Sequence, residues 1–85
     1  MTLTLEPVRV ATGADEDGVL VFADERLAAV LVHLSDENEI APREWYLETG
    51  FGPRLDGPNH PLFPSLEAAR QWIEQRLAWR VERSR

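Results

Sequence analysis

The sequence contains no cysteine and no lysine, and its apolar segments are short. Without cysteine the chain can form no disulfide, no thiolate metal site and no cysteine nucleophile. No segment approaches the roughly 20 apolar residues that a membrane-spanning helix needs. Residues 1–7 also lack the basic start and the apolar run of a signal peptide. We therefore expect a cytoplasmic protein that does not enter the membrane, because a cysteine-free chain suits a reducing compartment.

Positive charge is scarce in most of the chain. Residues 1–64 carry four Arg against twelve Asp and Glu, a net charge of −8, whereas residues 65–85 carry five Arg against three Glu, a net of +2. An acidic body argues against a broad nucleic-acid footprint, which needs clustered positive charge. The basic end has a structural explanation as well, since cations are favoured near the C-terminus of a helix.

Residues that could carry catalysis or hold a metal are few and dispersed. His33 and His60 lie in different predicted elements, with no second ligand at metal-binding spacing. The acidic run 15–17 is contiguous, unlike the alternating ligands of a calcium loop. Gly50 and Gly52 do not open directly onto a helix N-terminus, since residues 54–64 intervene, so they do not form a phosphate loop. We predict that the protein is not an enzyme and holds no cofactor and no metal.

The length of 85 residues predicts a single domain, residues 1–85. The strongest local signal is a helix that begins after Ser65, whose hydroxyl can cap the first turn, and that Pro64 keeps from extending backwards. Apolar residues recur along it at steps of three and four and form one stripe: Leu66, Ala69, Ile73 and Leu77. One helix cannot bury such a stripe alone, so it needs a sheet to lie on. Residues 80–85 are expected to be a frayed tail.

The segments before the helix read as strands. Residues 19–23 and 26–34 predict a β-hairpin, with either a two-residue turn that pairs Phe22 with Leu27 or a three-residue loop that pairs Phe22 with Ala28. Residues 44–51 alternate and predict a third strand, with Trp45, Leu47 and Phe51 on one side. A loop from about 50 to 62 without regular structure follows it.

Residues 1–12 form a candidate fourth strand or an arm, and Pro7 restricts that strand to a sheet edge. The prediction is an α+β domain: a three-stranded antiparallel meander, with this N-terminal edge strand as an optional addition, and one C-terminal helix packed on one face.

The segment from Phe63 to Ile73, with its Ala-x-x-Trp-Ile pattern, resembles a recurrent part of short bacterial β-β-β-α proteins. Together with the hairpin from Gly18 to Leu34, the resemblance covers about two-thirds of the chain. It implies the same element order and no named function, and it transfers no functional residue. The order is also similar to that of sheet-plus-helix DNA-binding domains of the integrase-arm type, which bind DNA through arginines and lysines on the sheet.

Two features suggest a surface that contacts a partner. Both hairpin strands are apolar on both faces, so one face, expected to hold Val19 and Val21, is left in water unless something covers it. The candidates for this cover are the N-terminal arm, Trp79 or a second copy of the chain. A second helical stripe contains Trp72 and Trp79, which either widen the buried arc or anchor a partner.

Tyr46 is the remaining candidate for partner contact, next to Trp45 and near Arg43 and Arg54. Exposed aromatic residues beside arginines can also stack on bases. The leading hypothesis is a non-enzymatic protein-interaction or regulatory module, which binds a protein partner or a second copy of itself. The alternative is a nucleic-acid-binding domain that uses the exposed sheet face or the Arg-rich C-terminus.

Overall fold

A computed structural model gives the fold of residues 2–11, 17–52, 54–57 and 60–83, with only the backbone described for residues 79–83. These residues form five strands and one helix in the order β1 (Leu3–Arg9), β2 (Asp17–Ala23), β3 (Arg26–His33), β4 (Trp45–Gly50), β5 (Leu62–Phe63) and α1 (Leu66–Arg83). Within these described residues, no helix is long and apolar enough to cross a membrane. Of the acidic run considered as a calcium loop, Asp17 is the first residue of β2, whereas residues 15 and 16 lie outside the described residues. The last two residues of the expected tail, 84 and 85, also lie outside them.

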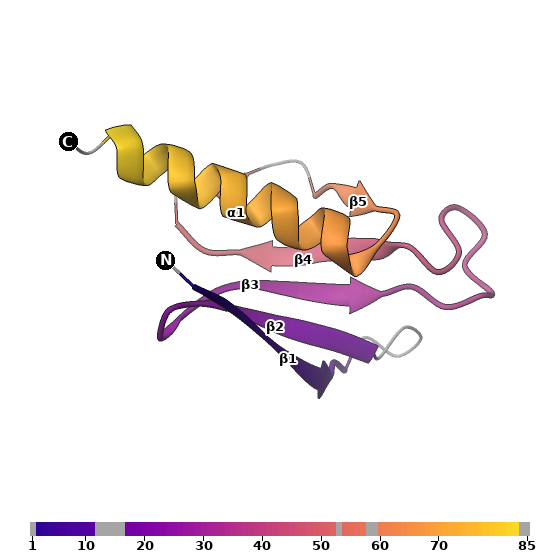
Figure 1. Cartoon of the computed structure of the whole chain (residues 1–85). Coiled ribbons are helices and arrows are strands. Elements are labelled where there is room, and N and C mark those ends of the chain that lie inside the picture. Colours follow the sequence, from indigo (N-terminus) through magenta and orange to yellow (C-terminus); the bar gives the residue numbers. More distant parts are fainter. Residues whose placement is uncertain (1, 12–16, 53, 58–59, 84–85) are drawn as a thin grey trace.

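The strands form one antiparallel sheet in chain order, β1-β2-β3-β4-β5 (Figure 1). The predicted α+β class and C-terminal helix are therefore confirmed. The candidate N-terminal strand forms as β1, at the edge of the sheet where Pro7 can lack an N–H group without losing a ladder bond. The predicted number of strands was too low, because β5 forms within the stretch expected as a loop. It consists of two residues, Leu62 and Phe63, opposite Tyr46 and Trp45.

The β2–β3 hairpin has the two-residue turn Asp24-Glu25, which pairs Phe22 with Leu27. The register shifts between Val21 and Phe22, since Val21 lies opposite Ala29. Asp24 has a φ of 58° and also secures the start of the chain. Its backbone N–H donates to the carbonyl of Thr2 at 2.7 Å, and its carboxylate accepts from the Thr2 N–H at 3.0 Å.

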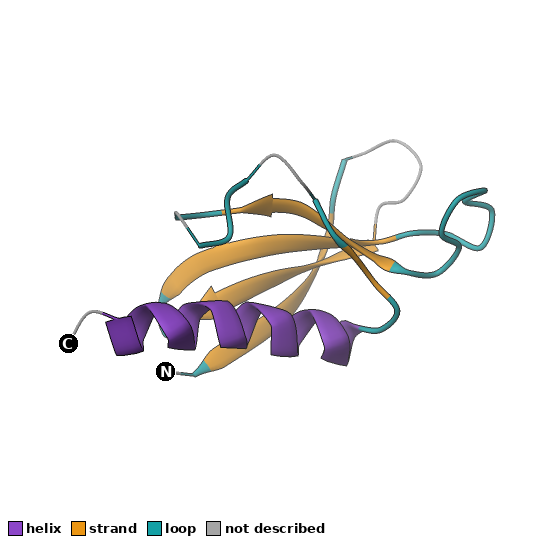
Figure 2. Ribbon diagram, turned by 90° about the horizontal axis from the view of Figure 1, so that it is seen from above, coloured by secondary structure: helices purple, strands orange, loops and turns teal. Residues whose placement is uncertain are grey.

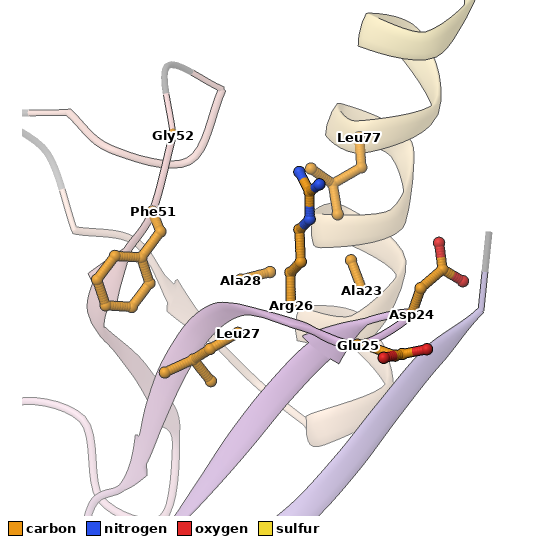
Figure 3. Close-up of a pocket in the computed structure, with 9 residues that line it drawn as sticks. All are labelled: Ala23, Asp24, Glu25, Arg26, Leu27, Ala28, Phe51, Gly52 and Leu77. Carbon is orange, nitrogen blue, oxygen red and sulfur yellow. The ribbon is translucent and has the colours of Figure 1, made fainter.

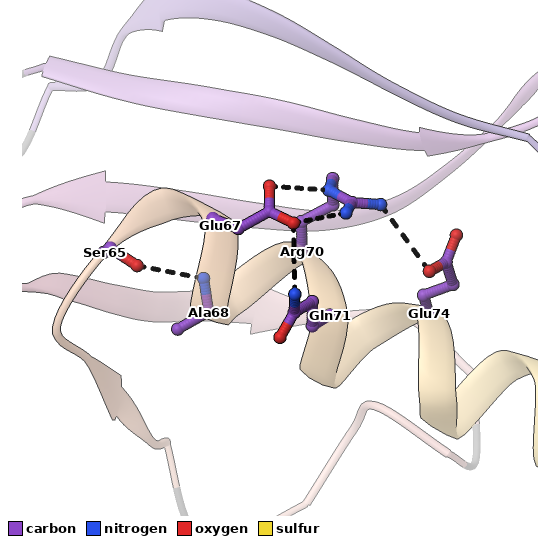
Figure 4. Close-up of polar contacts among 6 residues, drawn as sticks. All are labelled: Ser65, Glu67, Ala68, Arg70, Gln71 and Glu74. Atoms are coloured by element: carbon purple, nitrogen blue, oxygen red, sulfur yellow. Dashed lines mark hydrogen bonds and ion pairs between the residues drawn. The ribbon is translucent and has the colours of Figure 1, made fainter.

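The helix begins where the sequence predicts. The Ser65 hydroxyl accepts a hydrogen bond from the Ala68 N–H at 3.1 Å, so it caps the first turn (Figure 4). Along the helix, Ala69 and Ile73 are fully buried, and Leu66 and Leu77 are partly buried against the same core. α1 continues to Arg83, so the segment expected to fray from residue 80 is helical for its first four residues.

The helix lies along one face of the sheet (Figures 1 and 2), and the two enclose the core. We call this core the helix-side core. Its buried members are Val19, Val21, Ala28, Ala29, Leu31, Leu47, Leu55, Phe63, Ala69 and Ile73. Partly buried apolar side chains of β1, β2 and β4 surround it. The sheet therefore provides the apolar support that the helical stripe requires.

The placement of Val19 and Val21 on an uncovered sheet face is wrong. Val19 is 6% exposed and Val21 is 0% exposed, and both belong to the helix-side core. In a strand that is apolar on both faces, the sequence does not say which alternate set faces the helix. The structure assigns Val19 and Val21 to the inside, so Leu20 and Phe22 point to the other face.

Candidate protein interface

The sheet face opposite the helix carries apolar and aromatic side chains from several strands, with Glu6 and Thr49 among them. Leu20 lies between the two core valines Val19 and Val21, so its side chain points away from the core. The same alternation and the strand register place its neighbours on that face. We call this set the open face: Leu20, Phe22, Leu27, Val30, Val32, Tyr46, Phe51 and Leu62.

Phe51 joins the open face because the ladder between β3 and β4 is irregular. The sequence places Phe51 on the side of Trp45 and Leu47, but the register shifts between Val30 and Leu31. Gly50 faces the helix-side core, since a side chain there would meet Leu55. The next residue, Phe51, points the other way, so its expected side was wrong.

Several open-face residues are accessible to a partner. Leu27 is 36% exposed, Leu62 is 41% exposed and Phe51 is 50% exposed. Val32, at 2% exposed, is already covered by its surroundings although it does not belong to the helix-side core. The accessible apolar surface therefore lies toward both ends of this face. Single exposed apolar residues are common on proteins, whereas several that share one sheet face make this face a candidate for contact with a partner.

Glu6 brings a negative charge to the open face. Glu6 lies opposite Leu20 across the β1–β2 ladder, so it shares this face, and Glu48 is exposed on β4. Arg26 points to the helix side instead, because it pairs with Ala23, which packs on the helix-side core (Figure 3). An apolar face bordered by carboxylates is complementary to an apolar segment with basic neighbours.

A groove of 680 Å³ lies at the turn end of the β2–β3 hairpin, between the sheet and the second half of α1 (Figure 3). Leu77 lines it from the helix, whereas Leu27 and Phe51 line it from the sheet. In Figure 3, Leu27 points to the opposite side of the hairpin from Ala28. The groove thus adjoins the end of the open face and widens the apolar surface there.

The other predicted contact residues have different surroundings. Tyr46 is on the open face, where its ring stacks on His60 at 5.8 Å between centroids. Trp72 is half-buried, with its ring 5.4 Å from that of Phe63. The side chain of Trp79 lies outside the described residues. Of the predicted contact residues, the structure therefore places only Tyr46 on the open face.

The features considered for nucleic-acid binding do not come together. Trp45 and Tyr46 are neighbours in β4 and point to opposite faces, with Trp45 stacked on His33 at 4.2 Å on the helix side. Arg43 pairs with Asp36 at 3.2 Å. Arg54 instead approaches the helix, a contact that no local sequence pattern predicts.

The exposed surface of α1 carries a short ion-pair network (Figure 4). Arg70 donates two hydrogen bonds to Glu67 and lies 3.6 Å from Glu74. The hydrogen bond from Arg70 lowers the pKa of Glu67, and its positive charge and a hydrogen bond from Gln71 act in the same direction. The same pairing raises the pKa of Arg70. These groups stabilise the solvent-facing side of the helix.

Each histidine contacts a backbone carbonyl. His33 contacts the Arg43 carbonyl through Nε2 at 3.1 Å, and His60 contacts the Leu47 carbonyl through Nδ1 at 2.7 Å. Within the part of the chain that the structure describes, no three His, Asp or Glu side chains converge as metal ligands. Comparison of the chain with protein-family models, with curated proteins and with solved structures found no match.

Proposed function

We propose that this protein is a small non-enzymatic interaction module that binds a segment of another protein on its open face. The observation that carries the proposal is the set of exposed apolar side chains on the sheet face opposite the helix, with Leu27, Phe51 and Leu62 between 36% and 50% exposed. Burying one such side chain in an interface contributes about 1.5–3 kcal/mol. The cysteine-free sequence supports action in the cytoplasm.

The partner we propose is an apolar segment flanked by lysine or arginine. Glu6 shares the open face with Leu20, and the first 64 residues carry a net charge of −8. A second copy of the chain would bring two such acidic bodies together, and like charges facing each other disfavour that contact. Charge therefore favours a different protein over self-association.

The test compares two substitutions of exposed apolar residues, one on the open face and one away from it. Leu62→Ser alters the open face, whereas Ile40→Ser removes a side chain that is 90% exposed in the β3–β4 connection. Each variant and the wild type are used as bait, and the captured proteins are compared by mass spectrometry. A synthetic peptide from any captured protein is then titrated against all three.

The proposal predicts a peptide with an apolar core and basic flanks that binds wild type and Ile40→Ser and binds Leu62→Ser about tenfold more weakly. Equal binding by the two variants would contradict it. Sedimentation of the unliganded protein provides a second check, since self-association that Leu62→Ser abolishes would identify a second copy as the occupant.

The nucleic-acid alternative has less support, because Trp45 and Tyr46 point to opposite faces and the sheet region is acidic. A titration with single-stranded and duplex DNA or RNA at several salt concentrations tests it. Binding that weakens steeply with salt would favour the alternative over the protein-interaction proposal.

A further inference from the structure

A small pocket of 360 Å³ lies on one flank of α1, next to the segment that follows β4. Its lining side chains come from Arg54 in that segment and from Trp72, Gln75 and Arg76 in the helix. Arg54 and Arg76 are 22 residues apart in the sequence, yet the fold brings both to the same pocket. None of its lining residues among those described carries a carboxylate, although the chain as a whole has a net charge of −6.

The position of the Arg76 guanidinium is set by two contacts. Its Cζ lies 4.3 Å from the centre of the Trp72 ring, and its Nη1 donates to the Arg54 carbonyl at 3.5 Å. Trp72 is itself held by Phe63, a core residue that is 6% exposed. A cation held over an aromatic face and against a carbonyl is partly preorganised, so a ligand loses less free energy in ordering it.

The side chains around the pocket are mainly hydrogen-bond donors. A guanidinium carries five N–H donors and no acceptor. Among the described residues, the Arg54 carbonyl accepts one hydrogen bond from Arg76, so other donors of Arg76 can bind a ligand. The helix carboxylates on the other flank, Glu67 and Glu74, are held by Arg70. A ligand that complements this pocket therefore has to supply acceptors and negative charge.

We infer that this pocket binds a carboxylate of a peptide segment, either an Asp or Glu side chain or a C-terminal carboxylate. The planar guanidinium of Arg76 can bind a carboxylate through two parallel hydrogen bonds. The exposed part of the Trp72 indole offers an apolar surface to the adjoining residue of the peptide. A nucleic acid fits less well, because two arginines make few phosphate contacts and the acidic body repels a polyanion.

The test measures binding of three short peptides by the NMR shift of the Trp72 indole N–H. The first is acetyl-Gly-Leu-Glu-Leu-Gly-amide, the second replaces Glu with Gln, and the third, acetyl-Gly-Leu-Gly-Leu, ends in a free carboxylate. We expect a saturable shift with the Glu peptide, the free-acid peptide or both, and none with the Gln peptide. Comparison of the shifts caused by the Glu peptide and by the free-acid peptide identifies whether the pocket binds a side-chain or a C-terminal carboxylate.

Three arginine variants make the result specific to this pocket. Arg76→Gln should weaken binding about tenfold or more, because it removes a charge-assisted pair of hydrogen bonds. Arg26→Gln changes the net charge equally at an exposed position outside the pocket, and it should weaken binding less than about twofold, since salt screens distant surface charges. Arg76→Lys keeps the charge without the planar fork and should also weaken binding.

The inference is overturned if the Gln peptide binds as well as the Glu peptide, if no peptide shifts the indole resonance, or if Arg26→Gln weakens binding as much as Arg76→Gln. Tighter binding of single-stranded DNA that depends on Arg76 would replace the peptide with a nucleic acid. This site does not depend on the proposed function, because Leu62→Ser should leave peptide binding at Arg76 unchanged. Loss of binding at the open face can thus be distinguished from loss of binding at the Arg76 pocket.

Discussion

Gly50 occupies a position at which even one methyl group should disturb the fold. It ends β4, and a Cβ atom added there would lie 2.6 Å from the carbonyl oxygen of Leu55 and 2.7 Å from its Cβ. Leu55 is 4% exposed and belongs to the helix-side core, so it has little room to move. Forcing an extra carbon into a packed site generally costs about 1–3 kcal/mol. For a domain of this size, 2 kcal/mol lowers the melting temperature by about 8–16 °C.

Thermal unfolding of Gly50→Ala followed by circular dichroism measures this effect, with Gly57→Ala as the matched control. A Cβ at Gly57 would meet nothing within 4 Å, and the residue is exposed. The control should leave stability unchanged or raise it by up to about 1 kcal/mol, since alanine restricts the unfolded chain. If the melting temperature of Gly50→Ala lies within about 2 °C of that of the wild type, Gly50 does not pack as closely on Leu55 as described.

Three further substitutions test the core, the helix start and the ion pair. Ile73→Ala should lower the free energy of unfolding by about 2–5 kcal/mol in a denaturant titration, because Ile73 is fully buried; a loss under about 1 kcal/mol would contradict its core position. Ser65→Ala should cost about 1 kcal/mol through the lost cap at Ala68, whereas Ser65→Asp should retain most of the stability.

The third substitution concerns Glu67, whose pKa is lowered by its hydrogen bond to Arg70. The pair therefore stabilises the folded state fully above the usual pKa of 4.5. This contribution is lost as the pH falls through the lower pKa of the folded state. Glu67→Gln should therefore flatten the acid side of the stability–pH curve, and an unchanged acid side would refute the pairing.

The helix and the hairpin could be predicted from the sequence because each has a local cause. The serine at position 65 and the apolar spacing from Leu66 to Leu77 are sufficient to define the start and the buried stripe of α1. The two-residue turn at Asp24-Glu25 was one of two registers that the sequence allowed, and the structure selects it. The strand β5 could not be predicted, since two residues have no period to detect.

The surfaces were harder to predict than the elements, because they depend on which side of each strand faces the helix. Val19 and Leu20 are both apolar, and only the packing of α1 distinguishes their faces. The register shift in β4 then moves Phe51 to the open face. The meeting of Arg54 with Arg76 depends on the path of the segment after β4, which glycines and prolines punctuate without specifying.

The strict chain order of the sheet has a consequence for how the protein folds. Every strand pairs with the strand that precedes or follows it, so each closure joins stretches that are close in sequence. Domains built mainly from such local contacts reach the native state faster than sandwiches or barrels, in which distant strands must first meet. The meander can therefore grow one hairpin at a time from the Asp24-Glu25 turn, and the helix, which comes after all of the strands, can dock as the last step.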